Sequence, residues 1–171
     1  MTNEAICCLV EGRVFDWHGL EPFPIEEAPG CIGEQTASEW LKFKRGYASY
    51  RVFRGNPGGP EVWLFSFDGD SVELVELFSP PVSFGSEETL ALLGQPELIG
   101  DYPGAAQLQR PLRQPGEELR ELIYEERGLA LLLAHAPETA TRAVRVRGFE
   151  SMPAQTYYER FVELPEVQIT D

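Results

Sequence analysis

The turn Asp68-Gly69-Asp70 constrains the fold of this chain more than any other feature. It separates two stretches rich in β-forming side chains, 61–67 and 71–78. Asp-Gly supplies the positive φ that a type I′ turn between two strands requires. With a third strand expected at 50–54, the sequence predicts a three-stranded antiparallel meander. Alternation along the middle strand then places its side chains on two faces: Trp63, Phe65 and Phe67 on one, Val62 and Leu64 on the other.

The whole pattern predicts an α+β fold with a mainly antiparallel sheet, built from two three-stranded meanders and a short connecting helix. We expect a single domain over residues 1–171. It should contain an irregular N-terminal region over residues 1–46, a first meander 47–80, a helix 86–94, a loop 100–116 and a second meander 117–164. In the last meander, 143–149 alternates strictly, which predicts Val144 and Val146 facing inward and Arg145 and Arg147 facing outward.

Two segments are harder to assign. Glycine and proline break up the first forty residues, so we expect only short strands at Ala5–Val10 and Arg13–Trp17. The capping-box spacing of Thr36 and Glu39 predicts one helical turn over 36–41. The segment 156–164 fits either a strand or a helix.

The cysteines indicate a compartment. Cys7 and Cys8 are adjacent, and with Cys31 the three cannot all pair, so we predict free thiols and a reducing cytoplasm. As strand neighbours, Cys7 and Cys8 should point to opposite faces. No apolar run approaches the ~18 residues of a membrane helix, and the N-terminus lacks the basic region of a signal peptide. We therefore expect a cytoplasmic protein without a membrane partner.

The charge is strongly acidic, with 28 acids against 14 bases and a net charge of −14. Such a field repels nucleic acid and anionic membranes and attracts cationic surfaces, although solubility alone is the alternative explanation. The stretch 42–54 interleaves bases with aromatics, a pattern of single-strand binders. Acids flank it on both sides and oppose its field beyond a Debye length of about 8 Å, so we expect no nucleic-acid partner.

Candidate catalytic groups are few. The two histidines are His18 and His135, and a Cys–His pair with His18 lacks the local signature of a protease family. There is no Gly-x-Ser-x-Gly elbow, no metal-ligand spacing of cysteine or histidine, and no phosphate-binding loop. The turn at Asp68 lacks the remaining ligands of a calcium loop. The sequence therefore predicts no enzyme activity, no metal and no cofactor.

One stretch resembles known modules. Residues 86–149 run from a helix through Leu93-Gly94-Gln95-Pro96 and a polar loop to Ile123-Tyr124, then Glu126-Arg127-Gly128-Leu129 entering an apolar strand. This order resembles the helix-plus-meander modules of bacterial proteins such as the outer-membrane assembly lipoprotein BamE and immunity proteins of polymorphic toxin systems. No lipobox with a signal sequence precedes Cys7 or Cys8, so the resemblance favours the immunity-type role over the lipoprotein role.

Together these features predict a non-enzymatic acidic protein-binding module, and we suggest an immunity-type inhibitor that neutralises a basic toxin or enzyme. The alternatives are a structural or accessory subunit of a bacterial assembly and a small-ligand-binding protein. The sequence leaves the oligomeric state open. Carboxylates near the hairpin and helix start, with aromatic anchors, are the candidate contact residues. They are Asp68, Asp70, Glu73, Glu76, Glu87, Glu88, Trp17, Trp40 and Tyr102.

Overall fold

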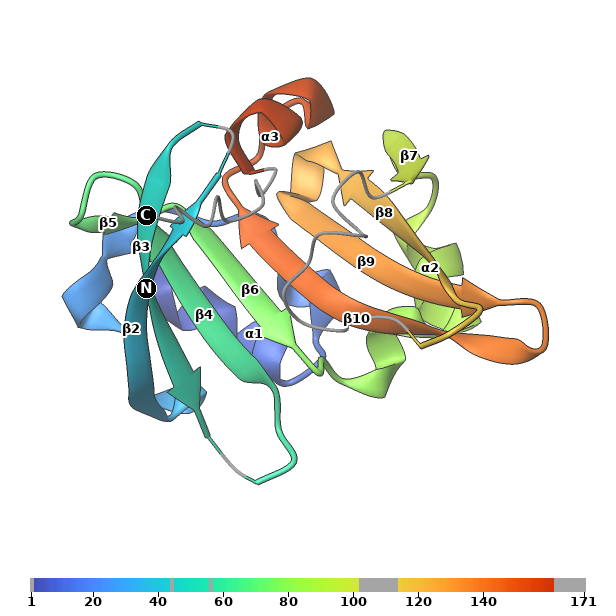
Figure 1. The fold of residues 1–171 in the computed structure, drawn as a ribbon, viewed down its shortest axis with the longest axis horizontal. Helices are drawn as coiled ribbons and strands as arrows, with labels where there is room; N and C mark the ends of the chain where they lie inside the picture. The colour runs from blue at the N-terminus through green and yellow to red at the C-terminus, as the bar shows by residue number, and fades with distance from the viewer. Residues whose placement is uncertain (1, 44, 56, 102–113, 162–171) are drawn as a thin grey trace, which may run out of the picture.

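The computed structural model describes residues 2–43, 45–55, 57–101 and 114–161 (Figure 1). Within them, a large antiparallel sheet has the strand order β2-β3-β4-β6-β10-β9-β8-β7, and β1 pairs with β5 in a small second sheet. The strands are β1 (Phe23–Pro24), β2 (Glu34–Lys42), β3 (Tyr47–Arg54), β4 (Glu61–Ser66), β5 (Ser71–Val72), β6 (Leu74–Phe78), β7 (Leu98–Asp101), β8 (Glu118–Tyr124), β9 (Leu129–Ala136) and β10 (Thr139–Phe149). The α-helices are α1 (Ile6–Val10), α2 (Glu87–Leu93) and α3 (Ala154–Phe161).

The expected α+β class with a mainly antiparallel sheet is confirmed. The sheet is nevertheless continuous, because β6 pairs with β10 through partners such as Leu77 and Val146. The structure therefore has one eight-stranded sheet where two meanders were expected, extended by β2 and β7 at its edges. The expected strand 71–78 is divided at Glu73, so that β5 pairs with β1 and β6 pairs with β4.

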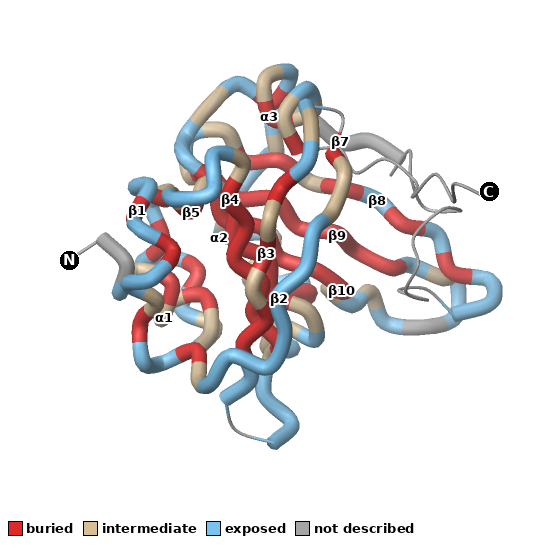
Figure 2. Tube along the Cα trace, turned by 60° about the vertical axis from the view of Figure 1, so that its left-hand side comes forward, coloured by how far each residue is buried: buried red, intermediate tan, exposed pale blue. Residues whose placement is uncertain are grey.

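Each face of the sheet carries its own core. Figure 2 shows that the central strands of the sheet are largely buried. The N-terminal segment and α2 pack against one face, which we call the N-terminal face, where Val62 and Leu64 are buried. The other, the α3 face, buries Trp63 and Phe65 with side chains of α3, and Phe67 packs against them. The side-chain alternation predicted for 61–67 is thus confirmed.

The predicted helix is also confirmed as α2. The Ser86 hydroxyl oxygen accepts a hydrogen bond from the backbone N–H of Thr89 at 3.2 Å, which caps the N-terminus of the helix. Gly94 follows the last turn with a φ of 81°, a conformation that favours glycine. Leu90 and Leu93 pack against the core of the N-terminal face.

Several predictions for the first 46 residues are wrong. Residues 36–41 lie in β2, which pairs along its length with β3, so cross-strand pairing outweighs the capping-box signal. Residues 6–10 form α1 instead of a strand, and Val14–Asp16 is a 3₁₀ turn. At the other end of the chain, Ala154–Phe161 is helical, which settles the choice left open for 156–164 up to Phe161.

The prediction of three free thiols is wrong as well. Cys7 on α1 forms a disulfide with Cys31, which lies just before β2, while Cys8 is free. Because 6–10 is helical, Cys7 and Cys8 are not alternating strand neighbours, and the expected division into one buried and one accessible thiol does not apply: both are half-buried. The disulfide joins α1 to the segment that leads into the edge strand of the large sheet.

Candidate functional site

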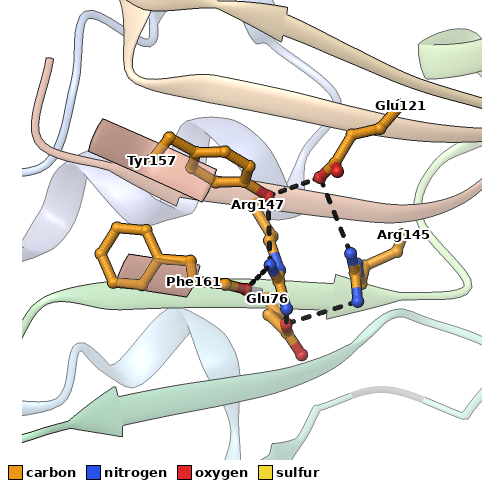
Figure 3. Close-up of polar contacts among 6 residues, drawn as sticks. All are labelled: Glu76, Glu121, Arg145, Arg147, Tyr157 and Phe161. Carbon is orange, nitrogen blue, oxygen red and sulfur yellow. Dashed lines mark hydrogen bonds and ion pairs between the residues drawn. The ribbon is translucent and has the colours of Figure 1, made fainter. Parts of the chain in front are cut away.

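Five charged or polar side chains meet on the α3 face, and we call them the buried cluster: Glu76, Glu121, Arg145, Arg147 and Tyr157 (Figure 3). Arg147 lies opposite Glu76 in the β6–β10 ladder, and its Nε donates to Glu76 Oε1 at 2.6 Å. Arg145 lies 3.8 Å from the same carboxylate and 3.7 Å from Glu121. Each of the four charged residues is 1% exposed, so two positive and two negative charges balance inside the protein.

The buried cluster holds α3 on the sheet. Arg147 donates to the Phe161 carbonyl oxygen at 2.5 Å and to the Tyr157 hydroxyl at 3.1 Å. Tyr157 in turn donates to Glu121 at 2.5 Å. Burial raises the pKa of the Tyr157 phenol well above its usual value, which keeps the donating proton in place. Two residues of α3 are therefore bonded to strands β8 and β10.

The predicted outward orientation of Arg145 and Arg147 is wrong for a physical reason. β10 lies in the interior of the sheet with both faces covered, and a register irregularity at Ala143–Arg145 interrupts the simple alternation. Alternation of apolar and charged residues does not distinguish an exposed face from a buried one with compensating charges. The sequence signal that points to burial is Glu76, the one charged residue in the otherwise apolar segment Leu74–Phe78.

Four exposed acids lie at the small sheet, and we call them the acidic rim: Glu26, Glu27, Asp68 and Asp70. β1 pairs with β5, and the Ile25 N–H donates to the Asp70 carbonyl at 2.8 Å, which brings the two acidic pairs to one end of the molecule. Asp68 accepts hydrogen bonds from the backbone N–H groups of Ser71 and Asp70 and from the Ser66 hydroxyl. These bonds hold the pKa of the Asp68 carboxyl below its usual value.

Strand β3 approaches the acidic rim through Arg51 and Glu26, and the edge strand β2 lies on the far side of β3. Residues 34–40 are all exposed, and Trp40 retains 65% exposure of its side chain. Tyr47 on β3 is 62% exposed, and the Lys42 ammonium lies 5.6 Å from its ring centre. Trp40 and Tyr47 share the N-terminal face. Arg51, also on that face, lies 4.0 Å from Glu26, which connects the strand pair to the acidic rim.

The structure brings together only some of the predicted contact set. Glu76 is in the buried cluster and Trp17 is fully buried, with its indole N–H donating to the Gly128 carbonyl at 3.1 Å, so both assignments to a surface are wrong.

The Glu73 carboxylate pairs with Arg45 at 3.0 Å. Glu87 and Glu88 are exposed on α2, beyond the opposite end of β6 from the hairpin, so the six predicted acids do not share one rim. Tyr102 lies outside the described residues.

The described residues offer little for catalysis. His18 and His135 are exposed, and His135 contacts the Thr141 hydroxyl at 3.0 Å. Cys7 and Cys31 are bonded to each other and so are not nucleophiles. No group of three His, Cys, Asp or Glu side chains in the described ranges is arranged to hold a metal ion. None of the helices in the same ranges is long and apolar enough to cross a bilayer.

Comparison of the chain with protein-family models, with curated proteins and with solved structures finds no match in any of the three.

Proposed function

We propose that this protein is a non-enzymatic acidic module that binds a basic partner protein, in the manner of an immunity-type inhibitor. The observation that carries the proposal is the acidic rim, joined through the Arg51–Glu26 contact to the face of the β2–β3 pair that exposes Trp40 and Tyr47. Protein interfaces commonly combine aromatic anchors with a polar periphery. Here Trp40 lies on the edge strand β2, Tyr47 lies on the neighbouring strand β3, and the carboxylates lie at the small sheet.

The charge distribution suits fast association. A net charge of −14 attracts a cationic partner over a distance, and exposed carboxylates mainly raise the association rate. Exposed acids on their own also serve solubility. What favours binding over solubility is the coincidence of the acidic rim with exposed aromatics, because an exposed tryptophan adds nothing to solubility.

The disulfide changes what the cysteines indicate about the compartment of the protein. The Cys7–Cys31 disulfide is typical of proteins from oxidising compartments, so the expectation of a cytoplasmic location loses its support from free thiols. An inhibitor that meets its target outside the cytoplasm is compatible with the binding role proposed here.

Binding is tested by capture from the native host, followed by association kinetics at increasing ionic strength. The rim variant carries Glu26→Gln, Glu27→Gln and Asp70→Asn. A matched control carries Glu87→Gln, Glu88→Gln and Glu138→Gln, which changes the net charge equally on exposed residues elsewhere. We expect a basic partner whose association slows with salt, and a rim variant that associates about tenfold more slowly at low salt than the control.

An acidic partner, or equal rates for the two variants, would leave the acidity as a matter of solubility and remove the basis of the proposal.

A further inference from the structure

The outer edge of β2 is open in the described structure. β2 is the terminal strand of the large sheet and pairs with β3 on one side. An edge strand directs alternate backbone N–H and C=O groups toward solvent, and extended peptides bind by pairing with them. Residues 34–40 of β2 are exposed, and Leu41 and Lys42 are half-buried.

The pairing of β2 with β3 limits where a strand can be added. A register irregularity separates Gln35 from Ala37, and irregularities of this kind twist an edge away from further pairing. From Ala37 to Lys42 the register with Val52 to Tyr47 is unbroken. The regular portion of the edge is therefore Ala37–Lys42.

We propose that the partner of this protein binds through an extended cationic segment, added as a further strand along Ala37–Lys42. The inference rests on the proposed function and specifies how the partner is recognised.

The charges of the surface select the occupant. β2 itself carries Glu34 and Glu39 against one base, Lys42, whose ammonium lies over the Tyr47 ring. The neighbouring strand β3 adds Arg51 and Arg54, and an acid lies beside each of them: Glu26 is 4.0 Å from Arg51, and Glu61 pairs with Arg54. The acidic rim lies beyond β3. A second copy of the chain would bring another net charge of −14 to the same edge, so self-pairing is disfavoured, as is an acidic segment.

The side chains of β2 also specify a pattern for the added strand. Trp40 lies on the N-terminal face, and Glu39 lies on the α3 face, where it accepts a hydrogen bond from the Tyr50 hydroxyl at 3.0 Å. A strand beside β2 alternates in the same way. Its side chains on the N-terminal face lie against the exposed Trp40 indole, and this contact favours a guanidinium or an apolar group. Its side chains on the α3 face lie near the Glu39 carboxylate, and this contact favours a cation.

The test uses the intact protein and short synthetic peptides of alternating arginine and valine, observed through the backbone amide resonances of the protein. Two further peptides carry N-methyl groups on one or the other alternate set of residues. A strand that pairs along one edge uses one set of N–H groups alone. A glutamate–valine peptide is the charge control.

We expect the arginine peptide to shift the amide resonances of Ala37–Lys42, one N-methylated peptide to bind equally well, and the other to lose binding. Trp40→Ala should weaken binding about tenfold, whereas Leu92→Ala, at a side chain with the same 65% exposure on α2, should not.

Shifts confined to the acidic rim, or equal binding of both N-methylated peptides, would overturn strand addition while leaving acid-based recognition intact. Equal binding of the glutamate peptide, or no binding by the arginine peptide, would overturn both the inference and the proposed function.

Discussion

Arg147 connects β6, β10 and α3, and we expect its loss to destabilise the fold strongly. Its guanidinium donates to Glu76, to the Tyr157 hydroxyl and to the Phe161 carbonyl, all within the protein interior. Arg147→Met keeps a long, flexible side chain but removes the charge and every one of these donors. Glu76, which is 1% exposed, then loses its Arg147 donor, while Arg145 stays 3.8 Å from its carboxylate.

The expected loss is large. Removing one partner of a buried ion pair costs about 3–5 kcal/mol, because the remaining charge stays buried. For a protein of this size, about 1 kcal/mol corresponds to about 2–4 °C in Tm, which gives a decrease of roughly 6–20 °C. The control is Arg13→Met, because Arg13 pairs with Glu11 and Asp16 at the surface, where such pairs contribute about 0–1 kcal/mol.

Urea unfolding followed by circular dichroism measures both variants. A second variant tests the attachment of α3. Tyr157→Phe removes the hydroxyl that donates to Glu121, and we expect the free energy of unfolding to fall by about 1.5–3 kcal/mol. Because Arg147 and Tyr157 share a hydrogen bond, the double variant should lose less than the two single losses combined. If the free energies of unfolding of Arg147→Met and Arg13→Met differ by less than about 1 kcal/mol, the buried cluster contributes no more than a surface pair. That result would rule out the prediction.

Three further changes test other regions of the structure. Cys7→Ser removes a disulfide that spans a sequence separation of 24 residues, and thermal unfolding should show a loss of about 3.5 kcal/mol, which would be absent if the thiols were already free. Gly128→Ala should cost more than about 2 kcal/mol, because the added Cβ would lie 2.0 Å from the Phe149 carbonyl oxygen at a φ of 56°, whereas Gly69→Ala in an open turn should cost less; equal losses would contradict this. Asp68→Asn should lower the free energy of unfolding near neutral pH, because the Asp68 carboxylate stabilises the fold only while it is ionised. The difference in unfolding free energy between the variant and the wild type should shrink as pH falls through the lowered pKa of Asp68, and a difference that does not vary with pH would contradict this prediction.

Local signals identified much of the fold. The β-forming residues on either side of Asp68-Gly69 predicted β4 with its partner strands and the faces of Trp63 and Val62, because strand propensity and alternation act over a few residues. The predicted type I′ turn is wrong, because Gly69 has a positive φ but Asp68 does not, and the β4–β6 pairing begins only at Phe65 and Leu74. Ser86 and Gly94 likewise predicted α2. Pairing between segments far apart in the chain left no such signal. The joining of β6 to β10 merged the expected meanders and buried the strand that carries Arg147.

The candidate site was predicted less completely for the same reason. Asp68, Asp70 and Trp40 are exposed as expected, since turns and edges expose polar side chains. Glu76 looked equally exposed from its charge, and its burial depends on Arg147, 71 residues further along the chain. Trp17 is one of the predicted contact residues, whereas its indole is buried against the segment at Gly128. Such long-range compensation is not visible in the spacing of residues within one segment.

We propose that the β2 edge and the acidic rim form the contact surface for a basic partner. Amide hydrogen exchange of the full chain, alone and with the captured partner, tests this proposal residue by residue. We expect slower exchange along Ala37–Lys42 and at the turn of Asp68–Asp70, with α2 unchanged. Slower exchange at Glu87–Leu93 with the amides of β2 unaffected would contradict it.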